Sequence, residues 1–144
     1  MAETTPPDTD EEMETVTSTD GTEIAFARTG SGPPLVLVHG TGYDHNYWEL
    51  SDLRPELAEQ HTVYAIDRRG HGGGGDAEAY DFEREFEDVA AVVDSIEEPV
   101  TLFGHSNGAL ISLEAALRTD NLHGLVLYEP TAGSEVPPEM TQLL

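Results

Sequence analysis

The sequence predicts an α/β protein with a mostly parallel β-sheet covered by helices on both faces. Short apolar runs, of the kind that form buried strands, alternate with segments of helical periodicity. Several of these runs end abruptly at glycine or polar residues, where a strand would leave the sheet. A chain of 144 residues is long enough for one domain with a core and too short for two.

The N-terminal residues 1–14 are predicted to form a disordered acidic tail, and residues 15–144 the folded domain. The tail combines two prolines and an acidic run with almost no apolar side chains. Beyond it, Asp20-Gly21 lies between Thr15–Thr19 and Thr22–Arg28, two segments rich in Thr, Val, Ile and Phe. An Asp-Gly pair between such segments predicts a β-hairpin.

Four buried strands and three helices are predicted after the hairpin. The strands are Leu35–Val38, Thr62–Ile66, Pro99–Phe103 and Leu122–Tyr128. The helices are Glu49–Gln60, Asp81–Glu97 and Ser106–Arg118, of which the second has the clearest apolar stripe. In a parallel sheet, sites form at the carboxyl ends of the strands, so the residues that follow each strand are the candidates for function.

Acidic residues dominate the composition. The 29 Asp and Glu oppose 6 basic residues, all of them arginine, which gives a net charge of -23. At low ionic strength these like charges repel one another and destabilise the compact state. Molar salt shortens the range of the repulsion, the Debye length, to about 3 Å. The composition resembles that of proteins from salt-loving archaea and predicts a halophilic protein. The alternative is an acidic partner of basic proteins or a nucleic-acid mimic, although the acids are spread along the whole chain.

Several classes of function are not expected from this composition. Without cysteine, the chain has no disulfide, thiolate zinc site or catalytic thiol. Binding to nucleic acid is disfavoured, because so few cations could neutralise phosphates. No secretory signal or membrane-spanning apolar run is visible, so a cytoplasmic protein without membrane contact is expected. No metal or organic cofactor is implied.

The strongest motif is Gly104-His105-Ser106-Asn107-Gly108, between a predicted buried strand and a predicted helix. A turn that raises a serine above the sheet brings neighbouring backbone close together, so its flanking positions must lack a Cβ atom. The helix that follows directs its free N–H groups and its positive dipole end at the hydroxyl, which favours an oxyanion. The motif therefore predicts that Ser106 is a nucleophile, with a glycine-rich helix cap as the alternative.

Two further stretches follow predicted strands in the same order as in a known family. They are His39-Gly40-Thr41 and the loop Asp67-Arg68-Arg69-Gly70-His71-Gly72. With the serine motif, they resemble the α/β-hydrolase fold family of the esterase, lipase and haloperoxidase-like type. The resemblance spans residues 16–130 and implies the α/β-hydrolase fold.

The resemblance also implies roles for individual residues. The backbone N–H groups of Thr41 and Asn107 would form the oxyanion hole. Asp67 and Arg68 would hold their loop together beside the sheet. His39 would orient the oxyanion loop, and His105 and His71 would be structural. The other histidines are interpreted as ordinary surface residues: His45, His61 and His123.

The catalytic triad of the family is incomplete in this sequence. Serine acyl transfer needs an acid and then a histidine after the nucleophile. The only later histidine, His123, begins a strand at the wrong end of the sheet, whereas Glu129 is a candidate acid or a structural carboxylate. The chain is therefore interpreted as the N-terminal portion of the fold, truncated after the strand that follows the nucleophile helix. Single domains of this type run to roughly 200–250 residues.

The sequence thus predicts a truncated hydrolase for an ester or related acyl bond of a small-molecule substrate, weak or inactive by itself. A serine nucleophile argues against dehalogenase or epoxide hydrolase chemistry, which needs a carboxylate. One alternative is a minimal enzyme with only Ser106 and the oxyanion hole. Another is a non-catalytic protein that binds a partner chain, or itself, through the open edge of its sheet.

Overall fold

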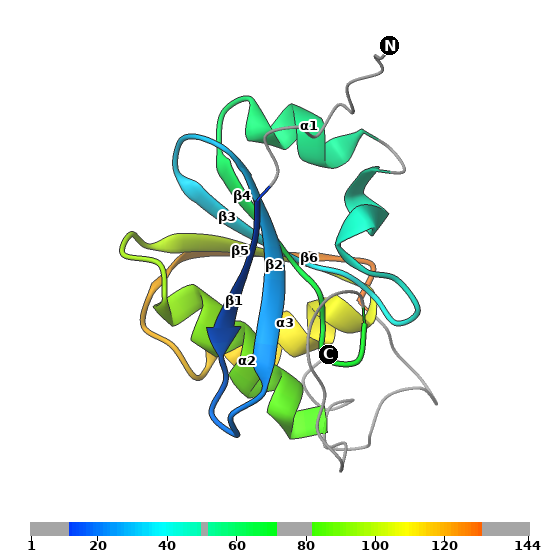
Figure 1. Ribbon diagram of the computed structural model, residues 1–144, viewed down its shortest axis with the longest axis vertical. Coiled ribbons are helices and arrows are strands. Elements are labelled where there is room, and N and C mark those ends of the chain that lie inside the picture. Colours follow the sequence, from blue (N-terminus) through cyan, green and yellow to red (C-terminus); the bar gives the residue numbers. More distant parts are fainter. Residues whose placement is uncertain (1–11, 50–51, 72–81, 131–144) are drawn as a thin grey trace.

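The computed structural model describes residues 12–49, 52–71 and 82–130. Six strands form one sheet in the order β1-β2-β4-β3-β5-β6 (Figure 1). Strands β4, β3, β5 and β6 are parallel to one another, while β1 and β2 are antiparallel to their neighbours. The bounds are β1 Glu12–Thr17, β2 Glu23–Gly30, β3 Pro34–Val38, β4 Thr62–Ile66, β5 Val100–His105 and β6 Leu122–Tyr128.

Helices cover both faces of the sheet, which confirms the predicted fold class. Helices α2 (Phe82–Asp94) and α3 (Asn107–Ala116) lie on one face, and α1 (Leu53–Ala58) lies on the other with the 3-10 helix η1 (His45–Glu49) (Figure 1). Two hydrophobic clusters result, one beneath α2 and α3 and a smaller one around Trp48 beneath α1. No helix in the three described ranges is both long enough and apolar enough to cross a membrane.

The predicted hairpin is confirmed, but its first strand is longer than expected. Strand β1 begins at Glu12, so the prediction of a disordered tail is wrong for residues 12–14. Glu14 pairs with Phe26 across the hairpin, and its carboxylate lies 2.6 Å from the guanidinium of Arg28. Backbone pairing thus holds polar residues in the sheet even though they add little to the core. The rest of the tail lies outside the described residues.

The helix predicted over residues 49–60 is shorter in the structure. Helix α1 begins at Leu53, with Pro55 in its first turn, where a missing N–H leaves no hydrogen bond unmade. Residues 50–51 are not described, and the preceding η1 buries the indole of Trp48. Asp52, just before α1, has a φ of 58°, so the backbone changes direction there rather than continuing one helix from residue 49.

Strand β6 lies where it was predicted, but the expectation that it is buried is wrong. None of its residues is buried, and Val126 and Tyr128 are 42% and 52% exposed. Leu122 and Leu125 pack against the cluster beneath α2 and α3. Among the described strands, β6 has only β5 as a neighbour. One-sided pairing and partial helix cover leave an apolar strand at the edge of the sheet.

Candidate active site

Ser106 occupies the turn between β5 and α3, with an unusual backbone conformation. Its φ is 59° and its ψ is -122°, in a region that L-residues other than glycine rarely adopt. Two hydrogen bonds hold this turn: the Ser106 N–H donates to Tyr128 O at 3.0 Å, and the Ala109 N–H donates to Ser106 O at 2.9 Å. Local strain of this kind persists only where the surroundings over-determine it, as they often do at functional sites.

The glycines on both sides of this turn are required by close packing. A Cβ atom on Gly104 would lie 2.4 Å from Gly108 O, and one on Gly108 would lie 2.3 Å from Val38 O. Both contacts are to backbone, which cannot move aside as a side chain can. The sequence prediction that these two positions must lack a Cβ is therefore confirmed by the geometry.

The loop after β3 lies against the serine turn. A Cβ atom on Gly40 would come within 3.2 Å of the Ser106 Cβ. Thr41 Oγ1 accepts hydrogen bonds from Asn107 Nδ2 at 2.8 Å and from Arg68 Nη1 at 3.3 Å. Four residues predicted for the site, Gly40, Thr41, Ser106 and Asn107, are thus brought together at the carboxyl ends of β3 and β5.

The His39 ring holds two loops in place as a neutral imidazole. Its Nδ1–H donates to Gly40 O at 2.7 Å, while Nε2 accepts the backbone N–H of Arg68 at 3.1 Å. Protonation of Nε2 would break the second bond. Burial of the ring lowers the pKa of His39 from 6.5 to about 4, and the nearby Arg68 charge acts in the same direction. The His71 ring contacts His39 with centroids 5.3 Å apart.

The loop after β4 is held by buried ion pairs. Arg68 makes a two-point contact with Glu85 of α2, at 2.6 and 3.0 Å. Arg69 does the same with Asp88, at 2.7 Å for both bonds, and also reaches Asp20 of the hairpin turn. These hydrogen bonds raise the pKa of Arg69 and lower that of Asp20. The structural role of Arg68 was expected from the sequence, whereas the network around Arg69 was not.

Asp67 is fully buried and bonds to a histidine that was interpreted as an ordinary surface residue. Its Oδ1 accepts the backbone N–H of His45 at 2.7 Å and lies 2.8 Å from Nδ1 of the same ring. That interpretation of His45 is wrong, because the ring is largely buried against the β4 loop. His45 and Asp67 follow the adjacent parallel strands β3 and β4, so the strand-end rule could have indicated the pair.

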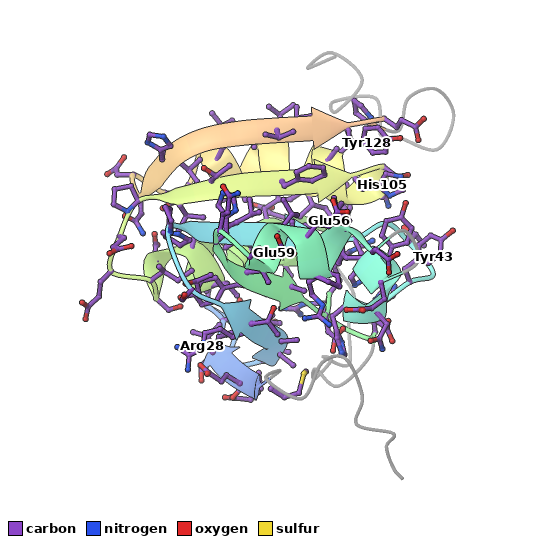
Figure 2. The ribbon with its side chains drawn as sticks, turned by 90° about the horizontal axis from the view of Figure 1, so that it is seen from above. Arg28, Tyr43, Glu56, Glu59, His105 and Tyr128 are labelled. Carbon is purple, nitrogen blue, oxygen red and sulfur yellow. The ribbon has the colours of Figure 1, made fainter. Side chains whose placement is uncertain are left out.

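His105 stands in a row of aromatic rings beside Ser106. Its ring stacks on Tyr47 and Tyr128, with centroids 4.8 and 5.4 Å away, and Nε2 lies 3.3 Å from the Tyr47 hydroxyl. Burial raises the pKa of Tyr47. Glu129, 68% exposed, has Oε1 3.7 Å from His105 Nε2. Figure 2 shows His105 and Tyr128 at the same edge of the molecule as Tyr43.

One group of described residues has the donor types of a metal site. Ligand atoms of Asp44, His45 and Asp67 lie within 4.8 Å of one another. These atoms already bond within the protein, since Asp67 accepts from His45 and Asp44 Oδ1 accepts the Asn46 N–H at 2.9 Å. The hydrogen bonds account for the arrangement without an ion.

The fold and this geometry define an α/β protein with its candidate site on a strained strand–turn–helix junction, beside a glycine-containing loop from the neighbouring strand. A sequence model described as the alpha/beta hydrolase family matches residues 35–144. The chain belongs to the α/β-hydrolase family.

Curated relatives of this chain include hydrolases. It is 34% identical over 115 residues to an uncharacterized hydrolase of Bacillus subtilis, covering 76% of this chain and 42% of that protein. It is also 34% identical over 107 residues to a pimeloyl-[acyl-carrier protein] methyl ester esterase of Aeromonas hydrophila, covering 72% of this chain and 40% of the relative. The chain thus spans less than half the length of either relative.

Solved structures of hydrolases also superpose on this chain. An α/β hydrolase from Sphaerobacter thermophilus superposes with a TM-score of 0.76 and 42% identity, over 88% of this chain and 50% of that structure. The esterase RhEst1 of a Rhodococcus species has a TM-score of 0.73 and 31% identity, over 82% of this chain and 46% of its own.

Proposed function

We propose that this chain carries the nucleophile of a serine hydrolase that cleaves an ester or related acyl bond. The observation that carries the proposal is the backbone of Ser106, which has a φ of 59° between β5 and α3 and is flanked by glycines that have no room for a Cβ atom. This strained turn places a half-buried serine at the carboxyl ends of the parallel strands. The esterases among the relatives favour acyl esters as the substrate class.

Oxyanion stabilisation would come from the backbone N–H groups of Thr41 and Asn107. Asn107 is the first residue of α3, and the first N–H groups of a helix have no partner within the helix. The Asn107 side chain bonds to Thr41 Oγ1, which ties the two candidate donors to one another. Preorganised donors of this kind stabilise the charge that develops on the carbonyl oxygen.

A covalent intermediate is the direct test of this proposal. In the reaction with p-nitrophenyl acetate, Ser106 Oγ would bond to the acetyl carbon, p-nitrophenolate would leave, and the hydroxyl proton would pass to water. His123 is the only histidine after Ser106 in this sequence, so the acyl-serine is expected to be hydrolysed slowly and to accumulate. After incubation with p-nitrophenyl acetate, mass spectrometry of the digested protein should find one acetyl group on the peptide that contains Ser106. The Ser106→Ala variant should lose this adduct, and Ser31→Ala, which changes an exposed serine, should keep it. Acetylation that persists in Ser106→Ala would overturn the assignment of the nucleophile.

We further propose that the acid and the histidine of the triad belong to a longer protein of which this chain is a part. The support is that the chain covers about half or less of its relatives' length. The intact mass of the native protein, extracted in molar KCl, tests this. A mass well above 15.6 kDa is expected, whereas a mass of 15.6 kDa would contradict it.

A second candidate function is binding of a partner chain, or of a second copy, through β6. The observation that favours it is the exposure of Val126 and Tyr128 on a strand at the edge of the described sheet. An apolar strand edge is a ready template for pairing with another chain. Sedimentation of the purified protein tests the binding of a second copy, because pairing through β6 predicts a mass that rises with protein concentration, whereas a monomer at all concentrations would contradict it.

A further inference from the structure

Four aromatic side chains form a continuous row next to the serine turn. The ring centroids lie 4.6 Å apart for Tyr43 and Tyr47, 4.8 Å for Tyr47 and His105, and 5.4 Å for His105 and Tyr128. Aromatic rings attract one another at separations of this size. These four side chains, called the aromatic row below, come from the loop after β3, from η1 and from the ends of β5 and β6.

Stacking holds the centre of the aromatic row in place. The His105 ring is nearly parallel to its neighbours, with interplanar angles of 16° to Tyr47 and 30° to Tyr128. Its Nδ1 is buried and makes no hydrogen bond with any described residue. Beneath the row, the buried Trp48 meets the Tyr47 ring edge-on, with centroids 5.0 Å apart. His105 therefore serves here as a flat ring, and the row has a rigid base.

The aromatic row reaches the candidate nucleophile. A Cβ atom on Gly40 would lie 3.2 Å from the Ser106 Cβ and 3.7 Å from His105 Nδ1, so the serine side chain and the ring nitrogen flank the same glycine. The Ser106 N–H also donates to Tyr128 O at 3.0 Å. A ligand that reacts at Ser106 thus has His105 and Tyr128 next to its reacting atoms.

The Tyr128 end of the aromatic row is open. Tyr128 is 52% exposed, whereas His105 and Tyr47 are half-buried. Among the described aromatic rings, only His105 contacts Tyr128. Burying this exposed aromatic surface against another ring is favourable, because stacked rings gain more than the area that they bury. The row can therefore be extended by one further ring at Tyr128.

A negative charge lies beside this open end. Glu129 follows Tyr128, and its carboxylate, 68% exposed, has Oε1 3.7 Å from His105 Nε2. Like charges repel one another, most strongly at low ionic strength, so a ligand group with its own carboxylate is disfavoured beside Tyr128. An uncharged ring meets no such repulsion.

We propose that the substrates of this chain are uncharged esters with an aryl group, and that the aryl ring stacks on Tyr128 as the next member of the aromatic row. This inference rests on the proposed function of Ser106 and names the substrate class of that site. The aryl ring belongs either to the acyl side or to the alcohol side of the ester. Methyl phenylacetate and benzyl acetate carry it on these two sides, so the tighter ligand identifies the side that the site accepts.

Fluorescence of Trp48 measures the binding. It is the only tryptophan of the sequence, and its ring contacts both Tyr47 and His105. The titrations use KCl at a concentration that keeps the protein folded by circular dichroism. An aryl ester should bind about threefold or more tightly than its saturated counterpart, methyl cyclohexylacetate or cyclohexylmethyl acetate, which has a similar shape without the aromatic ring. Equal binding of phenylacetate would overturn the requirement for an uncharged group.

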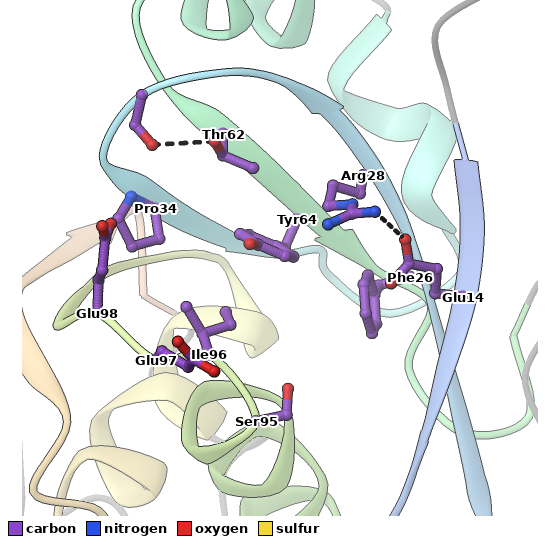
Figure 3. A pocket seen from close by; sticks show the side chains of 11 residues that line it. Glu14, Phe26, Arg28, Pro34, Thr62, Tyr64, Ser95, Ile96, Glu97 and Glu98 are labelled. Carbon is purple, nitrogen blue, oxygen red and sulfur yellow. Dashed lines mark hydrogen bonds and ion pairs between the residues drawn. The ribbon is translucent and has the colours of Figure 1, made fainter.

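Variants locate the aryl group. Tyr128→Leu should abolish the preference for the aryl ester, and Tyr128→Phe should keep it, since only the second variant retains a ring. Tyr43→Leu changes a similarly exposed tyrosine at the other end of the row and should keep the preference. The control far from the row is Tyr64→Leu. Tyr64 lines a pocket of about 350 Å³ where β3 and β4 begin, at the edge of the sheet opposite to Ser106 (Figure 3).

Equal binding of aryl and saturated esters to the wild type would overturn the inference, as would a preference that survives in Tyr128→Leu. An equal loss in Tyr64→Leu would place the aryl group in the other pocket and overturn it as well. Saturating aryl ester should also slow acetylation of Ser106 by p-nitrophenyl acetate, and an unchanged rate would overturn the link between the row and the serine. If Ser106 takes up no acetyl group at all, the proposed function fails, whereas binding that depends on Tyr128 would still support the aryl site.

Discussion

The inner strands of the sheet and the β6 edge are built from similar apolar sequences but differ in what surrounds them. Strand β3 is buried along its whole length, and alternate residues of β5 are buried. Strand β6 continues the same parallel ladder and has no buried residue. The loops next to the inner strands also hold fully paired buried charges. An apolar run thus specifies a strand, while burial depends on neighbours on both sides.

The largest expected difference is in the free energy of unfolding that is lost when a buried ion pair, rather than a partly exposed one, is broken. Replacing Arg69 by methionine leaves Asp88 and Asp20 without their partner, and breaking a buried ion pair costs about 3–5 kcal/mol of unfolding free energy. Arg118→Met, just after α3 where this helix meets α2, breaks partly exposed pairs with Glu83 and Glu114 and should cost about 1 kcal/mol or less. Denaturant unfolding at constant salt measures both losses. Equal losses would remove the distinction between buried and partly exposed charges.

Glycine substitutions test the same difference between the inner strands and the β6 edge. Gly108→Ala places a Cβ atom 2.3 Å from Val38 O and should cost about 3 kcal/mol of unfolding free energy. Gly124→Ala in β6 meets nothing closer than Thr101 Oγ1 at 3.9 Å, so it should change that free energy by less than about 0.5 kcal/mol. A tolerated Gly108→Ala would mean that α3 can move away from β3.

The stability of the folded protein should also depend on pH, because His39 is buried beside the inner strands. Its pKa in the folded protein is about 4, below the value of 6.5 in an unfolded chain. Between these values the unfolded state binds the extra proton, so stability falls as pH drops from 6.5 to 4, by at most about 3 kcal/mol. Below pH 4 this contribution stays constant.

His39→Gln is the control for this pH effect, since glutamine can accept the Arg68 N–H and does not titrate. The many carboxylates titrate in both proteins, so the difference between the two stability profiles isolates His39. Parallel profiles between pH 4 and 6.5 would show that the ring takes up its proton without cost in the folded state.

The smallest expected effect is at the edge itself. Val126→Lys should change the free energy of unfolding by less than about 0.5 kcal/mol, because the side chain is already 42% exposed. A lysine on an edge strand opposes pairing with another chain, so any self-association seen by sedimentation velocity should decrease. Val126→Thr, which keeps the β-branched shape without the charge, should associate as wild type does. Association unaffected by the lysine would place the contact elsewhere.

Local sequence signals accounted for the strands, the hairpin and the serine turn, because each depends on neighbours along the chain. The apolar runs and the glycines around Ser106 are of this kind. The contacts of His45 with Asp67, and of Arg69 with Asp20 and Asp88, join residues far apart in the sequence. The strand-end rule can place His45 and Asp67 at the same edge of the sheet, but no spacing of residue types along the chain specifies that these side chains bond, or that Arg69 reaches Asp20 and Asp88.

The hydrogen bond from the Ser106 amide to Tyr128 O crosses from the serine turn to the last residue of β6. Because the donor belongs to the serine turn and the acceptor to β6, in which no residue is buried, this amide reports on the pairing of β6 with β5. Its hydrogen–deuterium exchange rate would record how often β6 detaches from β5. A molecule that docks against β6 should slow the exchange at Ser106 without touching the serine.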